Sequence, residues 1–264
     1  MLRILLAILI ALPASAQERR PSHCIALARD AAKVFRASFG EPLAQDTVRI
    51  NYVDHATFVL ETQGGLTIAT DFTGFLGTRE LLPDVVTMNH AHGTHFTRAP
   101  DPEIPHVLRG WNPEGGAADH HLDLGEILIR NVPTDIRAAG GVEEFGNSIF
   151  VFEVAGLCIG HLGHLHHEPD LSQYAMLGRL DVVMAAIDGG TTLDLPTMIR
   201  VMDRIKARIV IPMHWFNEAS LERFLAGMDG AFAIRRTGES WIEVSPETLP
   251  DRPTVMVLEP RLLR

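Results

Sequence analysis

Three histidine-bearing segments each follow an apolar, strand-like run, and this arrangement constrains the fold more than any other feature of the sequence. The segments are residues 89–95, 160–167 and 212–214, and they hold most of the thirteen histidines. In layered α/β folds, ligand sites lie at the carboxyl ends of strands. Neutral imidazole is a preferred ligand of zinc and other late first-row metals. A single histidine is more simply a surface or core residue, but this grouping predicts a shared metal site.

The rest of the chain reads as strands alternating with helices, which indicates an α/β fold class in one domain without repeats or linkers. Strand-like runs cover 47–53, 56–61, 66–71, 84–88, 126–132, 148–154, 157–162, 182–187, 209–211 and a terminal 241–244. Helical spacing covers about 22–37, with Ser22 as N-cap, 194–206 and 218–226. We expect Pro133 to end the strand over 126–132, because proline cannot donate to a sheet ladder.

The first sixteen residues have the plan of a secretory signal peptide. Arg3 precedes an apolar run over 4–12, and Ala14-Ser15-Ala16 is a small-residue cleavage site before Gln17. The run is shorter than the roughly 20 residues that span a bilayer, and no other segment reaches that length. We therefore expect residues 17–264 to form the mature, secreted domain, periplasmic if the source is a Gram-negative bacterium, with an uncleaved anchor as the alternative.

Composition excludes some partners. The formal net charge is −10 and basic clusters are few, which argues against nucleic acid. Cys24 and Cys158 are too few for a disulfide framework. Cys158 lies in an apolar run, which favours a buried small hydrophobe, although a Cys24–Cys158 bridge is the alternative in an oxidising compartment.

The first histidine segment is similar to a known motif. His90-Ala91-His92-Gly93-Thr94-His95 resembles the H-x-H-x-D-H motif of the metallo-β-lactamase superfamily, and the likeness extends over about residues 47 to 216. Landmarks similar to those of the branch with L-ascorbate-6-phosphate lactonase-like proteins follow in order, at 51–58, 67–71, 161–164, 187–190 and 211–214. The resemblance implies a four-layered αββα sandwich. It also carries over four metal ligands: His90, His92, His95 and His214.

The sequence departs from the family pattern at both metal-binding aspartates. Thr94 stands where the family has one, and His164 stands where it has the bridging one, so His164 is a ligand by position with changed chemistry. The histidine that usually follows the strand over 126–132 is absent. Asp135 is the nearest candidate there, as a ligand or as the base that orients the attacking water, with a solvated loop carboxylate as the alternative.

These departures bear on the number of metal ions. Carboxylates offset the repulsion between two neighbouring divalent ions, and a neutral imidazole, with one lone pair, cannot bridge them. We therefore expect one ion in preference to two, Zn²⁺ first and another divalent transition metal second. A single zinc with an open position still lowers the pKa of a bound water from about 15.7 to about 7.

Other residues near the motifs have open roles. Asp71 and Asp188 are expected to hold ligand histidines in one tautomer. For His161, the sequence supports a role as metal ligand and a role as a residue that supports a ligand equally well. For His55, it equally supports a place in the site and a purely structural role. His166 and His167 could line the entrance to the site, but we expect them to be solvated. We expect His106, His120 and His121 to be surface residues.

The predicted function is a secreted metal-dependent hydrolase. A metal-bound hydroxide would attack an ester, lactone, amide or phosphoester of a small-molecule substrate. The alternative is a non-hydrolytic periplasmic metal-binding protein on the same scaffold, which the loss of both aspartates favours.

Overall fold

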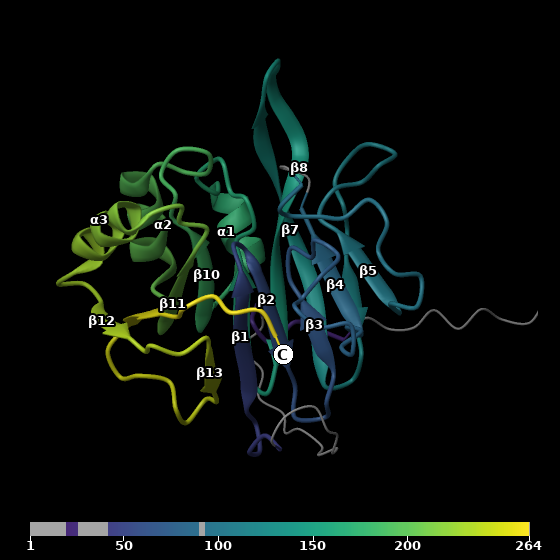
Figure 1. Ribbon diagram of the computed structural model, residues 1–264. Coiled ribbons are helices and arrows are strands. Elements are labelled where there is room, and N and C mark those ends of the chain that lie inside the picture. The colour runs from purple at the N-terminus through teal and green to yellow at the C-terminus, as the bar shows by residue number, and fades with distance from the viewer. Residues whose placement is uncertain (1–19, 26–41, 90–92, 264) are drawn as a thin grey trace, which may run out of the picture.

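The computed structural model describes residues 20–25, 42–89 and 93–263. The predicted signal peptide and most of the predicted helix over 22–37 lie outside these residues. Of the described part of that helix, 22–25, residues 23–25 form a turn. Two β-sheets stack face to face, and the helices pack on one outer side, as Figure 1 shows.

The first sheet has six strands in the order β13-β1-β2-β3-β4-β5. Their bounds are β1 Val48–Asp54, β2 Thr57–Glu61, β3 Thr67–Ala69, β4 Val85–Met88, β5 His106–Arg109 and β13 Trp241–Val244. The second has eight, in the order β12-β14-β11-β10-β9-β8-β7-β6. Their bounds are β6 His121–Asp123, β7 Ile127–Ala138, β8 Gly141–Val154, β9 Leu157–His161, β10 Val182–Ala186, β11 Ile209–Met213, β12 Ala233–Arg236 and β14 Thr254–Val257.

Alternating side chains build separate apolar layers on the two faces of each sheet. In β10, Val182 and Met184 enter the core between the sheets, whereas Val183 and Ala185 face the helices. Strand β2 follows the same rule, with Phe58 and Leu60 between the sheets and Val59 on the outer face. Period-two alternation with both faces apolar is what a sheet covered on both sides requires.

The described residues form three helices, α1 Leu171–Leu177, α2 Leu195–Ile205 and α3 Glu218–Met228. Asp170, Asp194 and Asn217 cap their N-termini, each accepting a main-chain N–H three residues on. All three pack on the outer face of the eight-stranded sheet. Among the described residues no helix covers the outer face of the six-stranded sheet, where loop residues such as Phe72, Leu76 and Ile104 supply the cover.

The prediction that a strand ends at Pro133 is wrong. Strand β7 runs on to Ala138, with Pro133 opposite Ser148 of β8. Proline is tolerated there because β6 pairs only with residues 128–130, so β7 is an edge strand beyond that point. The extended β7–β8 hairpin projects above the rest of the molecule in Figure 1, and its tip over 138–142 is exposed.

The two cysteines form a disulfide, so the expectation of a free, buried Cys158 is wrong. Their Cα atoms lie 5.9 Å apart, within the usual range for a bridge. Neighbouring contacts hold the same N-terminal segment: His23 N–H donates to Glu153 Oε2 at 2.9 Å, and Arg130 Nε donates to Glu153 Oε1 at 2.7 Å. Burial raises the pKa of Glu153, but hydrogen bonds from Ser22 and Arg130 outweigh it and hold that pKa below its ordinary value.

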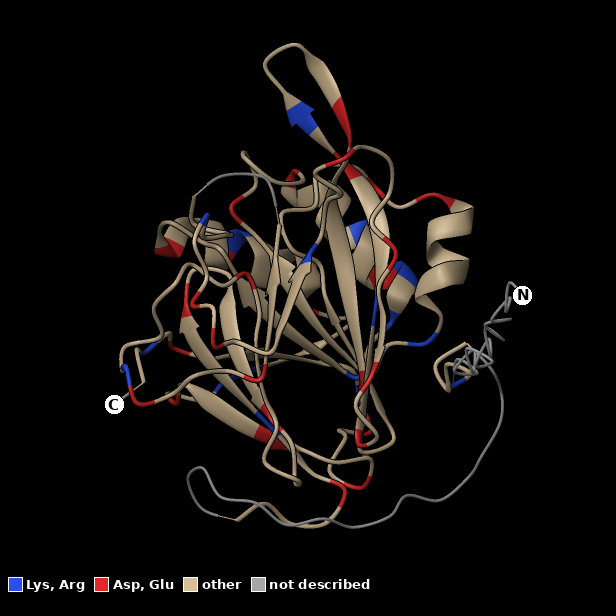
Figure 2. Cartoon of the chain, turned by 90° about the vertical axis from the view of Figure 1, so that its right-hand side faces the viewer, with Lys and Arg blue, Asp and Glu red and all other residues tan. Residues whose placement is uncertain are grey.

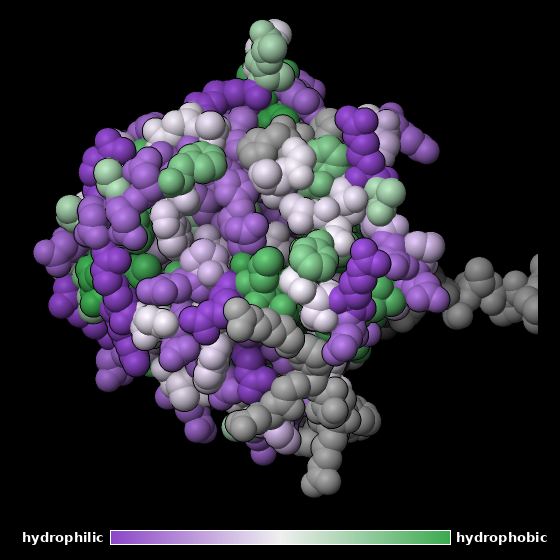
Figure 3. Space-filling view, viewed as in Figure 1, coloured by the Kyte–Doolittle hydropathy of each residue, from purple (hydrophilic) through white to green (hydrophobic). Residues whose placement is uncertain are grey.

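The surface is mixed in character. Figure 2 shows Lys and Arg interspersed with Asp and Glu, and Figure 3 shows a largely hydrophilic face over α2 and α3 with only small hydrophobic patches. In the described part of the chain, no helix is long and apolar enough to cross a membrane.

Candidate metal centre

Four strands end at one edge of the sandwich, and a histidine follows or closes each. His55 follows β1, His161 closes β9, His214 follows β11, and the segment that begins at Asn89 follows β4. His55, Asp71 and His214 have positive φ values of 44°, 41° and 59°, a backbone conformation that is costly for residues other than glycine. These turns place His55 beside His214 and Asp71 beside His95.

His95 and His214 bring their Nε2 atoms within 3.1 Å of each other, in a fully buried setting. A carboxylate stands behind each ring: His95 Nδ1 lies 2.5 Å from Asp71 Oδ2, and His214 Nδ1 lies 3.3 Å from Asp188 Oδ1. A carboxylate accepts the Nδ1 proton, so each Nε2 keeps its lone pair. Two lone pairs at this separation fit a shared cation, because ligand atoms about 2.0–2.1 Å from a tetrahedral zinc are only about 3.4 Å apart.

The orientation of Asp71 is fixed from the main chain. Ser148 N–H donates to Asn89 Oδ1 at 2.8 Å, which leaves the Asn89 amide nitrogen to donate to Asp71 Oδ1 at 2.8 Å. Gly163 makes room for this network, since a Cβ there would lie 2.5 Å from Asn147 Oδ1 and closer still to Asn89 Nδ2. The predicted role of Asp71 as the partner of a site histidine is confirmed.

Asp188 is held ionised behind His214. Burial raises the pKa of this carboxyl, but hydrogen bonds from His214, Thr192 and Thr191 and from the Gly190 main chain outweigh it and hold the pKa far below its usual range. A carboxylate that stays charged keeps the proton of His214 on Nδ1. The structure thus shows the predicted neighbour of His214, with Asp188 Oδ1 3.3 Å from Nδ1, and the tautomer that this carboxylate sets stays a prediction.

His164 lies beside this pair, with its ring centroid 4.7 Å from that of His95 and 5.0 Å from that of His214. Its Nδ1 lies 2.5 Å from His166 Nε2, and the Arg137 main-chain N–H donates to His166 Nδ1 at 2.5 Å. The expectation of a solvated His166 is wrong, because the β7–β8 hairpin brings Arg137 over it. His167 is exposed, as expected.

His55 lies beside His95 and His214, and these three residues, together with His164, are called the histidine cluster below. Its ring centroid lies 3.8 Å from that of His214 and 5.4 Å from that of His95, and one nitrogen from each of the three rings lies within 4.8 Å of the others. His55 O also accepts the His214 N–H at 2.9 Å. The sequence leaves its role open, and the signals that point to the site are its place at the end of β1 and its resemblance to a family position near the site.

His161 has a structural role. Its Nε2–H donates to Ala56 O at 2.8 Å, and Gly163 N–H donates to its Nδ1 at 3.2 Å. Both nitrogens therefore serve the main chain, and burial lowers the pKa of the ring, which keeps it neutral. Of the two readings of the sequence, the supporting role is the one that the structure shows.

Asp135 lies on β7, where its Oδ1 accepts the Phe145 N–H at 2.9 Å across the hairpin. Among the described residues, no hydrogen bond, ion pair or ring contact joins Asp135 to His95, His164 or His214. Its assignment as ligand or base stays a prediction. The predicted ligands His90 and His92 lie outside the described residues, and Thr94 is exposed.

Three further histidines are not free surface residues, contrary to expectation. His120 Nε2 lies 2.6 Å from Arg109 O, His121 Nε2 lies 3.1 Å from Arg20 O, and His106 is half-buried in β5. The rings of His120 and His121 thus bind main-chain carbonyl groups of other segments. They lie outside the histidine cluster.

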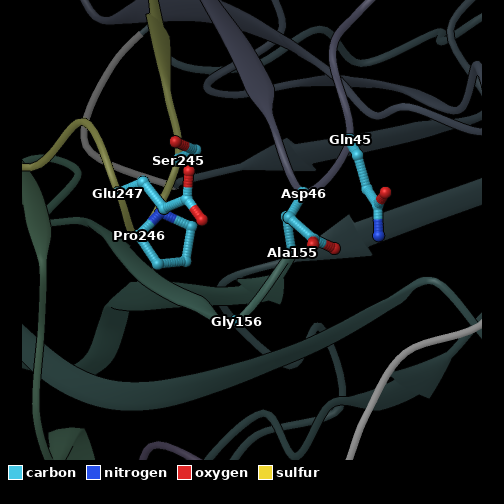
Figure 4. Close-up of a pocket in the computed structure, with 7 residues that line it drawn as sticks. All are labelled: Gln45, Asp46, Ala155, Gly156, Ser245, Pro246 and Glu247. Carbon is cyan, nitrogen blue, oxygen red and sulfur yellow. The ribbon is translucent and has the colours of Figure 1, made fainter.

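A separate cavity of about 520 Å³ opens at the opposite edge of the sandwich. Figure 4 shows its lining residues: Gln45, Asp46, Ala155, Gly156, Ser245, Pro246 and Glu247. Ala155 and Gly156 form the turn that precedes β9, whereas His161 ends that strand. The cavity is therefore no part of the histidine cluster.

The chain is similar to known metal-dependent hydrolases. A family model described as "Beta-lactamase superfamily domain" matches residues 49–214. A UPF0173 metal-dependent hydrolase of Archaeoglobus fulgidus is 24% identical over 232 residues, which cover 74% of this chain and 98% of the relative. Another UPF0173 metal-dependent hydrolase, from Nanoarchaeum equitans, is 26% identical over 188 residues, which cover 64% of this chain and 84% of the relative.

Solved structures give the same picture. A Thermotoga maritima protein, described as a candidate Zn-dependent hydrolase of the metallo-beta-lactamase superfamily, is 25% identical with a TM-score of 0.60, covering 80% of this chain and 99% of that one. Igni18, a metallo hydrolase from Ignicoccus hospitalis, has a TM-score of 0.51 at 18% identity, over 68% of this chain and 91% of that one. At that identity the second likeness shows the fold alone.

Proposed function

The chain belongs to the metallo-β-lactamase superfamily and is a metal-dependent hydrolase, and on that premise we propose that it is an exported zinc enzyme acting on a small-molecule ester, lactone, amide or phosphoester. The observation that carries the zinc proposal is the pair of buried Nε2 atoms, 3.1 Å apart, on His95 and His214. Imidazole nitrogens with carboxylates behind them suit zinc, whereas carboxylate-rich sites suit magnesium or manganese.

A bound zinc ion supplies Lewis acidity and lowers the pKa of a coordinated water. The residues of the chain prepare its site. His95 and His214 offer lone pairs, Asp71 and Asp188 hold the protons on the far nitrogens, and the burial of both rings keeps bulk water out. His90 and His92 are proposed to complete the ligand set of one ion.

Export is the second part of the proposal. The signal-peptide pattern over residues 1–16 suggests it, and the Cys24–Cys158 disulfide supports it, because such bridges persist in oxidising compartments and are rare in the cytosol. Fractionation of the source cells, with N-terminal sequencing of the mature protein, tests this part. A cytoplasmic protein that keeps residues 1–16 would contradict it.

The reaction is tested with purified protein, freed of metal and then titrated with Zn²⁺, against a panel of chromogenic esters, lactones, amides and phosphodiesters. We expect turnover of at least one class to appear with about one equivalent of zinc and to be lost in His214→Ala. Stoichiometric zinc binding without turnover of any substrate would overturn the proposed reaction and favour the rival function, a non-hydrolytic metal-binding protein.

A further inference from the structure

We propose that His164 is a hydrogen-bond donor in this centre, presenting Nε2–H to an oxygen atom of the substrate, and is not a ligand of the metal. The inference rests on the proposed function, since it assumes a metal at His95 and His214. It concerns a different property of the site, namely which of its imidazole nitrogens carry protons.

The argument starts at the main-chain amide of Arg137. This N–H can only donate, and it lies 2.5 Å from His166 Nδ1, so that Nδ1 must be the acceptor. A neutral His166 then carries its proton on Nε2. That Nε2–H donates to His164 Nδ1, 2.5 Å away, so that His164 Nδ1 is an acceptor in turn. A neutral His164 must therefore hold its own proton on Nε2, where a metal ligand needs a lone pair.

A second chain of hydrogen bonds also starts at a main-chain amide but ends with the opposite polarity. Ser148 N–H donates to Asn89, Asn89 donates to Asp71, and Asp71 accepts from His95 Nδ1. The carboxylate accepts on both sides and so reverses the direction of donation. This chain leaves a lone pair on His95 Nε2, whereas the chain from Arg137, which contains no carboxylate, leaves a proton on His164 Nε2.

The position of His164 suits a donor. Its main-chain N–H donates to Asn147 Oδ1 at 2.9 Å, and its side chain is almost fully buried. Nδ1 is turned to His166, and the ring centroid of His164 lies 4.7 Å from that of His95 and 5.0 Å from that of His214, so the ring borders the proposed metal site. Attack of water on a carbonyl or phosphoryl centre moves an electron pair onto the substrate oxygen. A fixed N–H in a site without bulk water stabilises that charge and transfers no proton.

Metal content separates a donor from a ligand. Zinc stoichiometry and affinity are measured by elemental analysis and chelator competition for the wild type, His164→Ala, His164→Gln and His214→Ala. We expect His214→Ala to weaken zinc binding by at least about 100-fold, since it loses a ligand. Both His164 variants should keep one equivalent and stay within about threefold of the wild type. A loss of zinc from folded His164→Ala as large as that in His214→Ala would overturn the inference.

Spectroscopy reads the proton directly. In ¹⁵N-histidine-labelled protein, His164 should show an unprotonated Nδ1 and a protonated Nε2, with and without metal. In the ¹¹³Cd-loaded protein, His214 Nε2 should couple to the metal and His164 Nε2 should not. His166→Ala removes the donor to His164 Nδ1 and should mix the two tautomers. Coupling between ¹¹³Cd and His164 Nε2 would also overturn the inference.

Turnover of a substrate found in the panel gives the last measurement. Loss of one such donor costs about 10²–10³-fold in kcat, so His164→Ala should fall in that range, and His164→Gln, which keeps an N–H, should recover part of it. Equal kcat in His164→Ala and the wild type would overturn the donor role. Absence of turnover in the wild type would refute the proposed function, while the metal and NMR results would still decide the polarity of His164.

Discussion

Asp71→Asn should move the proton of the His95 ring from Nδ1 to Nε2, and it should weaken metal binding without removing any ligand. Asp71 is fully buried and accepts from both Asn89 and His95. In the variant, the amide oxygen would still accept from Asn89, because the Ser148 N–H fixes the direction of that bond. The new amide NH₂ would then face His95 Nδ1 and drive the His95 proton onto Nε2, where the lone pair is needed.

To bind metal, the variant must break that new bond and leave a buried donor unsatisfied, at a cost of about 1–3 kcal/mol. Outer partners of metal ligands contribute about 10–100-fold in affinity, or about 1.4–2.7 kcal/mol, which agrees. Zinc Kd by chelator competition is the assay, with ¹⁵N spectra of His95 alongside. Asp84→Asn is the matched control, because the Asp84 side chain accepts from Thr67 and, among the described residues, from no other; this variant should leave Kd unchanged. A wild-type Kd and tautomer in Asp71→Asn would refute the reasoning.

Three more predictions concern stability. Replacing Cys24 and Cys158 with Ala should lower the free energy of unfolding in urea by about 2–5 kcal/mol while zinc stoichiometry stays the same; an unchanged free energy would contradict the bridge. Gly163 has a φ of 59°, and Gly163→Ala should lower the free energy of unfolding in the same assay by about 1–3 kcal/mol. It should also weaken zinc binding, because the added Cβ would displace Asn89. The control Gly140→Ala places its Cβ in open space and should have neither effect. The pKa of Glu153 is held below its ordinary value of 4.5, so its stabilising contribution is present above pH 4.5 and is lost as the pH falls through its lowered pKa. Glu153→Gln should therefore flatten the dependence of the free energy of unfolding on pH below 4.5. The same pH dependence in the variant and the wild type would disprove this.

Much of the framework follows from local patterns in the sequence. The apolar run over 182–187 and the helix over 194–206 correspond closely to β10 and α2, because burial on both faces and an Asp194 cap leave clear local signals. Short or half-exposed elements such as β5, β6 and β12 carry weaker signals and were not predicted. Pro133 misled the prediction because edge position, which tolerates it, is a property of the assembled sheet.

The site, too, could be predicted from the sequence only in part. Strand-end position and residue type were sufficient to place His95 and His214 together and to assign Asp71 and Asp188 as their partners. Neither could show that His166 lies between Arg137 and His164, since that contact joins residues 29 positions apart and depends on the length of the hairpin. Proton positions belong to the hydrogen-bond network, and the network exists only in the folded chain.

Both of the hydrogen-bond chains that set the polarity of the centre begin at main-chain amides of the β7–β8 hairpin, those of Arg137 and Ser148. Nineteen of the twenty common amino acids supply that N–H, and only proline lacks it. The N–H that starts each chain is thus kept whichever other residue stands at that position, although the side chains of Arg137 and Ser148 also make hydrogen bonds of their own. Vulnerability to mutation is concentrated in the links that follow, where a change at Asn89, Asp71 or His166 breaks a chain.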